Sequence, residues 1–566
     1  MTPTHPRTLR SRRAGPWLAA AALSLACQAP PRARDEAGPE DKPATPAADP
    51  AKAADEPAPL SPIAPAGPHA FSVLDLLEMD RLSEPRVSHD GAQVVYTLRE
   101  TDLVGNKARR SLWVVALAGG EPRPLETAAN GQPADGSDPR WSSDGAHVYF
   151  VSKRSGSPQV WRAPITGGAA TQVTALPVDV SGLKLSPRGD RLLVTAELFP
   201  DCDTLACTKQ RLDARADDKV TGVRYEQLFV RHWDTWKDGR RAALLLAPTD
   251  GAAPVGDATI LTRGLLADVP SKPFGGSEEY AFSPDGAHVV FTARRGDARE
   301  PWSTNFDLYR VAVDGDEPPQ NLTEANLAWD THPLFSADGR SLFYLAMARP
   351  GYEADRFRVV QQAFPMGERR VIAEGWDRSV SDMILAPDGA SLYVVAQDLG
   401  HTPLFRVTLA DGKVEKIVND GTVSAPSIAG DRLVYLRNDL SHPDELYTAG
   451  LSGEAPSQRT HVNDALLSRV SMGAAEQFEF KGWSDERVYG WIVKPVDFKE
   501  GERYPLALLI HGGPQGSFGN RFHYRWNPQT YAGAGLAVVM IDFHGSTGYG
   551  QAFTDAIGGD WGGKPL

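Results

Sequence analysis

The dominant pattern along this chain is a tight polar turn followed by a short apolar strand, and it recurs. Five copies share the dipeptide Asp-Gly before a run of β-branched and aromatic residues: Asp90-Gly91, Asp144-Gly145, Asp285-Gly286, Asp338-Gly339 and Asp388-Gly389. Two weaker copies change the order, at Gly189-Asp190 and Gly430-Asp431. Because Asp and Gly can supply the positive φ angles of a tight hairpin, each copy predicts a turn between two strands.

More strand follows each turn. Apolar runs at 111–117, 159–164, 307–312 and 403–408 predict further strands, which brings each unit to four. Most turns are spaced near the period of about 40–50 residues that propeller repeats have. The sequence therefore predicts an all-β fold over residues 70–462, a seven-bladed β-propeller.

One interval between turns, from Gly189 to Gly286, is about twice as long as the others and predicts an insertion at about 198–242. It contains a helical pattern at 208–219 and a polar and aromatic run at 225–236. A segment inserted on one face of a propeller is a place where contacts with substrates or partners are built. Trp233 and Trp236 in this run are expected to be buried against the edge of a blade.

The N-terminus has the pattern of an export signal. Arginines at positions 7, 10, 12 and 13 precede an apolar run, 17–26, that is too short to span a bilayer. The run ends in Leu23-Ser-Leu-Ala-Cys27, which resembles a bacterial lipobox. We expect residues 1–27 to be a signal peptide with Cys27 as the site of lipid attachment, and an ordinary cleaved signal peptide is the alternative. The protein is expected to be exported, either periplasmic or membrane-anchored on the periplasmic or outer-membrane side.

Residues 28–69 are rich in Pro, Ala, Asp and Glu, and this composition predicts a disordered tether. The two cysteines within the insertion, Cys202 and Cys207, are expected to form a local disulfide, because an exported chain meets an oxidising compartment. A metal site is the competing interpretation. Two thiols without further Cys or His nearby fall short of a tetrahedral set of ligands.

Composition and charge narrow the class of protein. The chain has 566 residues with 41% apolar content, enough for several buried cores, and its net charge is −13. No basic stripe is visible beyond the extreme N-terminus, which argues against a nucleic-acid partner. No metal or organic cofactor is implied, since no cluster of ligands is present.

The pattern changes after residue 462. Runs at 478–480 and 488–493 predict an antiparallel pair of strands. The continuous apolar run 506–510 predicts a strand buried on both faces, and 537–541 predicts a second such strand, with a crossover helix between them in 518–535. The segment 475–566 is therefore interpreted as the N-terminal part of a doubly wound α/β domain.

The tetrapeptide His511-Gly-Gly-Pro514 directly follows the first of these strands and resembles the oxyanion-hole loop of an α/β-hydrolase. Further on come Asp542-Phe-His-Gly-Ser-Thr-Gly-Tyr-Gly550 and Gly559-Asp-Trp-Gly-Gly-Lys-Pro565. In this order and behind a propeller, these motifs are similar to those of the prolyl oligopeptidase family of serine peptidases. Within it, the chain resembles the branch of acylaminoacyl-peptidases and dipeptidyl-peptidase 5.

The resemblance implies a Ser-Asp-His triad and acyl-enzyme catalysis. No Gly-x-Ser-x-Gly motif occurs between Gly513 and Leu566, so the triad is expected beyond Leu566 and the chain as given is expected to be inactive. The resemblance also implies that His511, Gly512 and Gly513 form the oxyanion-hole loop, with Gly513 N–H as the donor and His511 as a brace rather than a general base.

The substrates implied are short peptides, cleaved by an oligopeptidase or by an aminoacyl or dipeptidyl exopeptidase. Exopeptidases of this fold hold the substrate ammonium group with carboxylates from the propeller side, and Glu226 in the insertion is the candidate here. A solvated glutamate on an exposed segment is the alternative. For the whole protein, the alternative function is a non-catalytic propeller lipoprotein that binds or scaffolds other proteins.

Overall fold

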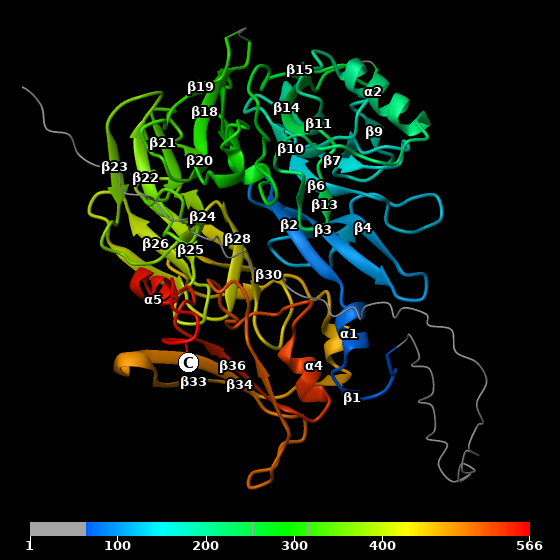
Figure 1. Ribbon diagram of the computed structural model, residues 1–566. Helices are drawn as coiled ribbons and strands as arrows, with labels where there is room; N and C mark the ends of the chain where they lie inside the picture. The colour runs from blue at the N-terminus through cyan, green and yellow to red at the C-terminus, as the bar shows by residue number, and fades with distance from the viewer. Residues whose placement is uncertain (1–63, 252, 315–316, 566) are drawn as a thin grey trace, which may run out of the picture. The chain divides into compact units, whose positions relative to one another are not determined.

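The computed structural model describes residues 64–251, 253–314 and 317–565 (Figure 1). Most of their regular secondary structure is β-strand, and the strands follow the predicted repeats. Among the described residues, no helix is both long enough and apolar enough to cross a membrane. Cys27 and the predicted signal peptide lie outside the described residues.

Seven four-stranded antiparallel sheets follow one another along the described chain, coloured from blue to yellow in Figure 1. The first three are β2 (Arg81–Val87), β3 (Gln93–Asp102), β4 (Lys107–Ala116) and β5 (Arg123–Pro124); β6 (Ser137–Trp141), β7 (His147–Ser152), β8 (Gln159–Pro164) and β9 (Thr171–Gln172); and β10 (Ser181–Leu185), β11 (Arg191–Leu198), β14 (Arg241–Pro248) and β15 (Thr259–Ile260).

The fourth and fifth sheets are β16 (Tyr280–Phe282), β17 (His288–Ala293), β18 (Asp307–Ala312) and β19 (Gln320–Asn321); and β20 (Asp330–Phe335), β21 (Ser341–Ala346), β22 (Arg358–Ala363) and β23 (Arg369–Ile372). The sixth and seventh are β24 (Val380–Leu385), β25 (Ser391–Ala396), β26 (Leu404–Thr408) and β27 (Val414–Val418); and β28 (Thr422–Ala429), β29 (Arg432–Asn438), β30 (Glu445–Gly450) and β31 (Ser457–Gln458).

Each predicted turn joins the first and second strands of one sheet. The glycines of these turns have positive φ, for example 69° at Gly91 and 74° at Gly189. The prediction that Asp also takes a positive φ is wrong. Asp90 instead accepts hydrogen bonds from Ser88 Oγ at 2.5 Å and Ala92 N at 3.0 Å, so its carboxylate braces the turn while glycine makes the bend.

Apolar clusters fill the spaces between sheets. One cluster joins the second and third sheets through Val160 and Val194, and similar clusters lie between each later pair. Another joins the first sheet to the seventh, where Val94 and Tyr96 pack with Val434 and Leu446. Because each sheet packs against a neighbouring sheet on both of its faces, β-branched and aromatic residues recur in the strands of each repeat.

The insertion lies within the third sheet. β11 and β14 pair antiparallel along their whole length, and their last pair is Leu198 with Arg241, so the intervening residues leave the sheet and return to it. The insertion contains α2 (Leu205–Asp217), β12 (Arg231–His232) and β13 (Thr235–Trp236). The helix therefore begins a little before the run predicted for it.

The C-terminal sheet has the order β33-β34-β36-β35. Its strands are β33 (Ala475–Lys481), β34 (Arg487–Val493), β35 (Leu506–Leu509) and β36 (Ala537–Asp542). β33 and β34 are antiparallel as predicted, whereas β35 and β36 are parallel and are connected through α4 (Pro528–Gly533). A helix, α5 (Gln551–Asp555), follows.

The prediction that 506–510 is buried on both faces is wrong in this structure. Leu506, Leu508 and Ile510 are 62%, 52% and 69% exposed, while Ala507 and Leu509 pack against the core of the sheet. β35 is at the edge of the sheet and has one neighbour, and no described residue covers its second face.

The first folded residues pack with the C-terminal segment. β1 (His69–Ala70) pairs in parallel with β32 (Val470–Ser471), and α1 (Val73–Glu78) is followed by Met79, which lies in one cluster with Phe71 and Phe522. A short helix, α3 (Asp464–Leu467), precedes β32. The chain is folded before residue 70, since Ala64 is 7% exposed. The sequence places residues 64–69 in the tether and 70–79 in the propeller, and these bounds stay predictions.

Candidate functional site

The segment after β35 is a tight loop, His511-Gly-Gly-Pro514. Gly513 has a φ of 138°, and a Cβ added to it would lie 2.6 Å from the Gln515 nitrogen. Within the described part of the chain, the Gly513 N–H donates no hydrogen bond. The loop therefore presents a free backbone donor at a position that requires glycine.

The His511 side chain is packed inside the domain and holds this loop. Its Nε2 is hydrogen-bonded to Ser546 Oγ at 2.9 Å, and its ring stacks on Phe543 with centroids 4.5 Å apart. Only 7% of the side chain is exposed. The imidazole is therefore held on both its edge and its face.

Asp542, at the end of β36, ties the neighbouring segments together. It is 3% exposed and accepts hydrogen bonds from Ser517 Oγ at 2.5 Å, Phe518 N at 3.1 Å and Tyr549 OH at 2.7 Å. Burial and the adjacent Asp542 raise the pKa of Tyr549 well above its ordinary range, so the phenol stays protonated and donates. The carboxylate therefore ties the segment that follows the His511 loop to Tyr549 in the glycine-rich segment.

An apolar cavity of about 390 Å³ lies beside the loop. It is lined by the loop itself and by side chains of the C-terminal segment, among them Ile510, Ile541, Phe543, Ile557 and Trp561. A free N–H next to an apolar hollow is suited to a carbonyl oxygen that becomes negatively charged while the adjacent side chain is held in the cavity.

The glycine-rich segment after β36 is attached to the fifth and sixth sheets. Leu399 N donates to Gly548 O at 3.0 Å, and Thr547 Oγ1 donates to Gln397 Oε1. Gln551 N, at the start of α5, donates to Asp377 Oδ2 at 3.0 Å. Loops of the repeat sheets thus help to position the segment that holds His511.

Glu226 does not lie in a preformed pocket. Its side chain is 70% exposed and forms an ion pair with Arg224, which is itself 86% exposed. The two tryptophans of the insertion are also exposed, Trp233 by 66% and Trp236 by 59%, so the prediction that they are buried is wrong. They instead contact other residues of exposed loops: Trp236 stacks on Tyr225, and Trp233 packs against Phe274.

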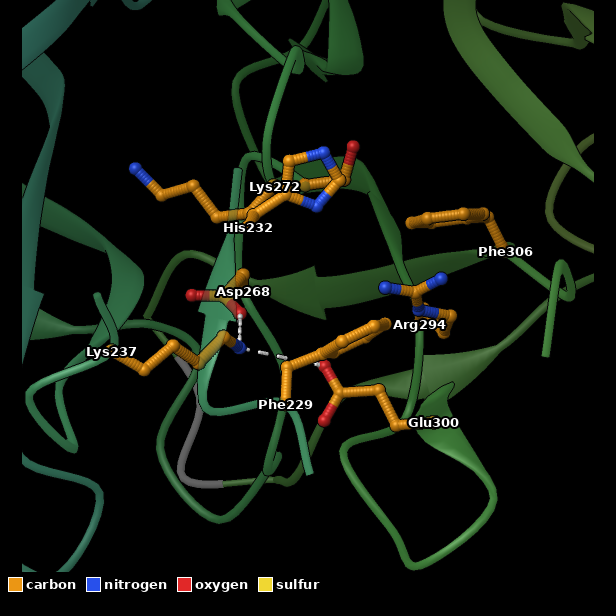
Figure 2. Close-up of a pocket in the computed structure, with 9 residues that line it drawn as sticks. Phe229, His232, Lys237, Asp268, Lys272, Arg294, Glu300 and Phe306 are labelled. Atoms are coloured by element: carbon orange, nitrogen blue, oxygen red, sulfur yellow. Dashed lines mark hydrogen bonds and ion pairs between the residues drawn. The ribbon is translucent and has the colours of Figure 1, made fainter. Parts of the chain in front are cut away.

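Buried carboxylates occur at the root of the insertion (Figure 2). Arg241 donates to Glu300 Oε2 at 2.6 Å and to Asp268 Oδ2 at 2.9 Å. Lys237 Nζ lies 3.5 Å from Asp268 and 3.8 Å from Glu300, as the dashed lines show. Both carboxylates therefore already have cationic partners within the protein. Sequence patterns did not single them out, because the partners come from separate strands and loops.

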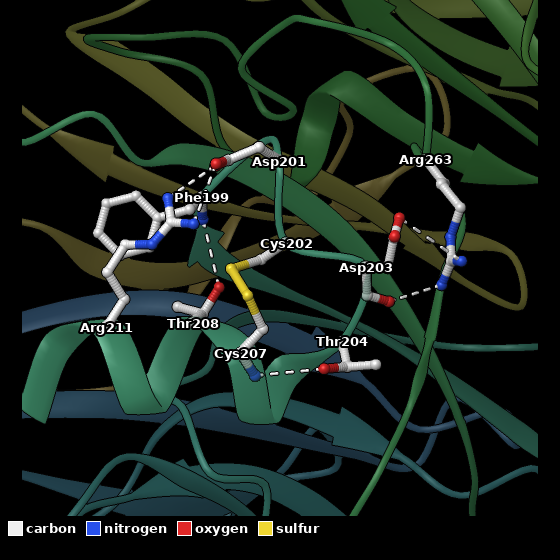
Figure 3. The surroundings of a disulfide bond; sticks show 9 residues. All are labelled: Phe199, Asp201, Cys202, Asp203, Thr204, Cys207, Thr208, Arg211 and Arg263. Carbon is white, nitrogen blue, oxygen red and sulfur yellow. Dashed lines mark hydrogen bonds and ion pairs between the residues drawn. A yellow bond between two sulfur atoms is a disulfide. The ribbon is translucent and has the colours of Figure 1, made fainter.

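The cysteine pair forms a disulfide in this structure (Figure 3). The Cα atoms of Cys202 and Cys207 are 5.5 Å apart, and Cys207 lies in the first turn of α2. Arg211 of the same helix pairs with Asp201 at 2.7 Å. The bond fastens the start of α2 to the strand end that precedes it. In the part of the chain that the structure describes, no group of three or more His, Cys, Asp or Glu could hold a metal ion.

The structure brings His511, Gly512 and Gly513 together with residues that sequence reasoning gave no role. Ser546 and Asp542 are the most important of these. Ser546 bonds to His511, and Asp542 bonds both to the segment that follows the loop and to Tyr549. The glycine-rich stretch at 545–550 was the available signal, because a segment with several glycines often packs closely against other backbone.

Comparison with known proteins agrees with this arrangement. The model of the prolyl oligopeptidase family matches residues 522–566. Dipeptidyl-peptidase 5 of Porphyromonas gingivalis is 30% identical over 493 residues, covering 87% of this chain and 70% of the relative. Probable dipeptidyl-peptidase 5 of Arthroderma benhamiae is 31% identical over 526 residues, covering 88% and 70%.

The chain belongs to the prolyl oligopeptidase family. It is accordingly a serine peptidase, a class of hydrolases. Among solved structures, it is similar to an acylaminoacyl peptidase in complex with Z-Gly-Gly-Phe-chloromethyl ketone, with a TM-score of 0.66 and 21% identity over 85% of this chain and 68% of that one. The acylaminoacyl peptidase of Pyrococcus horikoshii gives a TM-score of 0.65 at 21% identity, covering 86% and 69%. These likenesses show the fold, a β-propeller followed by an α/β-hydrolase segment.

Proposed function

We propose that this protein hydrolyses short peptides, as an oligopeptidase or as an aminoacyl or dipeptidyl exopeptidase, through an acyl-enzyme. The observation that carries the proposal is the free Gly513 N–H beside the apolar cavity, in a loop braced by His511. The relatives named dipeptidyl-peptidase 5 support cleavage of peptides.

In the proposed reaction, a serine hydroxyl attacks the peptide carbonyl and a histidine takes the proton and returns it to the leaving amine. The serine, aspartate and histidine of this triad are expected beyond Leu566. Gly513 N–H donates to the oxygen that becomes negative when the carbonyl carbon turns tetrahedral. Because His511 already holds the loop in place, the charge would be stabilised without reorganising the loop.

The seven repeat sheets are proposed to be the blades of one closed propeller. The apolar cluster between the first and seventh sheets supports closure, since Val94 and Val434 belong to the two ends of the repeat. A closed propeller attached to the hydrolase segment would cover the active site and admit short peptides rather than folded proteins. The same geometry would let an insertion reach the substrate.

Glu226 remains the proposed site for the substrate ammonium group. This proposal is supported by the exposure of the Glu226 side chain, which leaves its carboxylate accessible. The carboxylates of Asp268 and Glu300, in contrast, are already neutralised by Arg241 and Lys237. The exposed Arg224 partner would have to be displaced by the ammonium group. Exposed ion pairs of this kind contribute little free energy, so the displacement costs little.

The N-terminus is proposed to export the protein and to anchor it through a lipid on Cys27, with residues after it as a spacer. The supporting observations are the basic and apolar pattern of residues 1–27 and the Pro and Ala content of the following stretch. The protein would then act in the periplasm or at a membrane surface facing it.

The reactive serine decides between this proposal and a non-catalytic scaffold. The chain of 566 residues should not be labelled by a fluorophosphonate reagent, whereas protein made from the coding sequence continued past Leu566 should be labelled and should release dipeptides or amino acids from peptide substrates. If the continued sequence lacks Gly-x-Ser-x-Gly and the product is not labelled, the scaffold is favoured. Preference for simple esters over aminoacyl amides would instead indicate an esterase.

A further inference from the structure

Three consecutive sheets carry a basic residue at the same place in their first strand. Arg86, Arg140 and Lys184 have the same spacing from the turns that follow them in the first, second and third sheets. The corresponding residues of the fourth, fifth and sixth sheets are apolar, in the order Ala281, Leu334 and Ile384. The first three sheets therefore carry a basic residue at this position, and the next three sheets do not.

A bulge in each of the three strands gives these side chains a common environment. The pairing register shifts between Ser83 and Arg86 in the first sheet, and equivalent shifts occur in the second and third. At each bulge one residue has a positive φ: 55° at Glu84, 56° at Asp138 and 55° at Gly182. A bulge bends the strand and redirects the side chains beside it.

All three cations line one open cavity of about 460 Å³. Its walls also include two aromatic side chains, Trp141 and Phe282, and the polar residues of the turns. The Trp141 indole N–H donates to the Arg86 carbonyl at 2.8 Å, which fixes this aromatic wall. The cavity therefore combines a cationic side with an apolar side.

Among the described residues, only one of the three cations forms a direct ion pair. Arg140 pairs with Asp138 at 2.7 Å. Within the described residues, Arg86 and Lys184 form no ion pair and donate only to backbone carbonyls, Arg86 to Pro85 at 2.9 Å and Lys184 to Tyr280. Glu84, Asp138, Asp382 and Glu278 act on these cations from outside the cavity, but no described Asp or Glu lines it, so the charged groups at its wall are basic.

The electrostatics of these groups agree with the geometry. Burial, and then the charge of Arg140, lowers the pKa of Arg86 to about 10. Burial, followed by the charges of Arg140 and Arg86, lowers the pKa of Lys184 to about 7. Cations that are partly desolvated and repel each other are stabilised when an anion binds among them.

We propose that this cavity is a binding site for a carboxylate joined to an apolar group, with the carboxylate on Arg86, Arg140 and Lys184 and the apolar group against Trp141 and Phe282. A short peptide with a free C-terminus and an aromatic organic acid share this chemistry. The site is separate from the His511 loop, because it opens at the turn ends of the sheets. The C-terminal segment contacts the opposite ends, at Asp377 and Gln397.

Calorimetry with the 566-residue chain tests the proposal. Gly-Phe should bind about tenfold or more tightly than Gly-Phe amide, which has the same apolar group without the carboxylate. The variants Arg86→Gln and Lys184→Met should lose this difference. Lys153→Met, which removes an exposed lysine of the second sheet outside the cavity, should keep it. Equal binding of acid and amide, or unchanged binding in both cavity variants, would overturn the proposal.

Hydrocinnamate distinguishes the two sources of the carboxylate. If it binds as well as Gly-Phe, the site recognises organic acids in general, and if it binds at least about tenfold more weakly, the site recognises peptides. Tighter binding of inorganic phosphate than of either acid would contradict the proposed contact of the ligand's apolar group with Trp141 and Phe282. Each acid is compared with phosphate in the same buffer.

Chemical labelling provides a test that needs no variant. A lysine with a lowered pKa reacts readily with acetic anhydride near neutral pH, so Lys184 should be acetylated early, as read by mass spectrometry of its peptide. N-acetyl-Gly-Phe, which has no free amine to consume the anhydride, should slow acetylation of Lys184 and leave Lys153 unaffected, and N-acetyl-Gly-Phe amide should slow neither. Labelling of Lys184 at the same rate with and without N-acetyl-Gly-Phe would show that the site is not occupied by a carboxylate.

Discussion

Gly513 joins backbone geometry directly to the proposed chemistry, because its φ of 138° aims the loop and leaves no room for a side chain. In protein made from the coding sequence continued past Leu566, we expect Gly513→Ala to lower kcat by about a hundredfold or more. The added Cβ would displace the backbone N–H, and loss of an oxyanion donor has an effect of this size. Gly562→Ala is the matched control, since a Cβ there would meet nothing within 4 Å. Peptidase assays on both variants, with thermal unfolding to check the fold, measure the effect. Equal activity of the two variants would show that Gly513 is not the donor.

The buried carboxyl group of Asp330 should make the stability of the folded protein depend on pH. It is 1% exposed, its Oδ1 accepts a hydrogen bond from Asn326, and no described residue donates to its Oδ2. Burial raises its pKa from the ordinary value of 3.8 to about 7. The folded state therefore keeps the proton over a range in which the unfolded chain has lost it, so this group stabilises the fold most at low pH, and the contribution is lost as pH rises towards 7.

Asp330→Asn imitates the protonated acid at every pH. The melting temperature of the original chain minus that of the variant should fall as pH is raised from about 4 to about 7 and should then stay level. Differential scanning fluorimetry across this range gives the two curves. A difference that is independent of pH would show that Asp330 is ionised in the folded protein.

At the scale of single residues, the sequence predicted local geometry better than exposure. The conformation of the turn glycines depends on a few neighbours and was predicted correctly. The exposure of Trp233 and Trp236 depends on which distant surfaces come near the insertion, and composition favours burial for any tryptophan. Ser546 was not predicted as a partner of His511 because 35 residues separate them.

The insertion helix is an element whose stability rests on several local contacts. The disulfide from Cys202 to Cys207 closes its first turn, Thr204 accepts a hydrogen bond from Cys207 N at 3.2 Å, and Arg211 pairs with Asp201. A disulfide that closes so short a loop stabilises by about 2 kcal/mol in the chain-entropy view. We expect Cys207→Ser under non-reducing conditions to speed proteolysis within the insertion and to change the overall melting temperature little.

Limited proteolysis with mass spectrometry follows this insertion directly. Thr204→Ala serves as a comparison, since loss of an N-cap costs about 1 kcal/mol and should give a smaller change. A large fall in the melting temperature of the whole chain would instead show that the insertion is part of the main folding unit.

Because one face of β35 is apolar and exposed, we expect this chain to self-associate. Leu506, Leu508 and Ile510 project from an edge strand that has unpaired backbone groups on its open side. Leu508→Lys places a charge on the open face and should reduce association, as measured by analytical ultracentrifugation. Phe498→Lys, which alters an apolar residue with 41% exposure outside the strand, is the control and should have less effect.

At the scale of elements, strand identity followed from sequence, whereas strand environment did not. The pair β33 and β34 and the strand β36 lie where their apolar runs predict. β35 has the same kind of run, but its burial depends on its place in the order of the sheet, which the run does not encode. A continuous apolar run predicts a strand that can be buried on both faces, but the neighbouring elements decide whether both faces are covered.

For the whole molecule, contacts between the ends of the described chain are the part that repeats cannot predict. β1 pairs with β32, and Phe71 packs with Phe522 although the two are far apart in the sequence. These contacts attach residues 64–79 to the C-terminal segment, and α1 also contacts β3 of the first sheet. The repeat pattern begins only at Arg81, so nothing in its period indicates where the preceding residues lie.

The link between α5 and the fifth sheet can be measured as a coupling energy. Arg349 donates to both oxygens of Asp555 at 2.8 Å, and Tyr352 OH and Gln551 Nε2 donate to the same carboxylate at 3.0 and 2.8 Å. Since 43% of the Arg349 side chain is exposed, we expect a double-mutant cycle of Arg349→Met and Asp555→Asn to give a coupling energy of no more than about 1 kcal/mol.

Amide hydrogen exchange in α5 should accelerate in Arg349→Met. It should remain unchanged in the control Arg310→Met, whose arginine bonds to Gln320 elsewhere in the protein. Unchanged exchange in α5 would mean that the backbone contacts of Gln551 with Asp377 are sufficient to hold this segment, and that the loop carrying His511 is positioned without the ion pair.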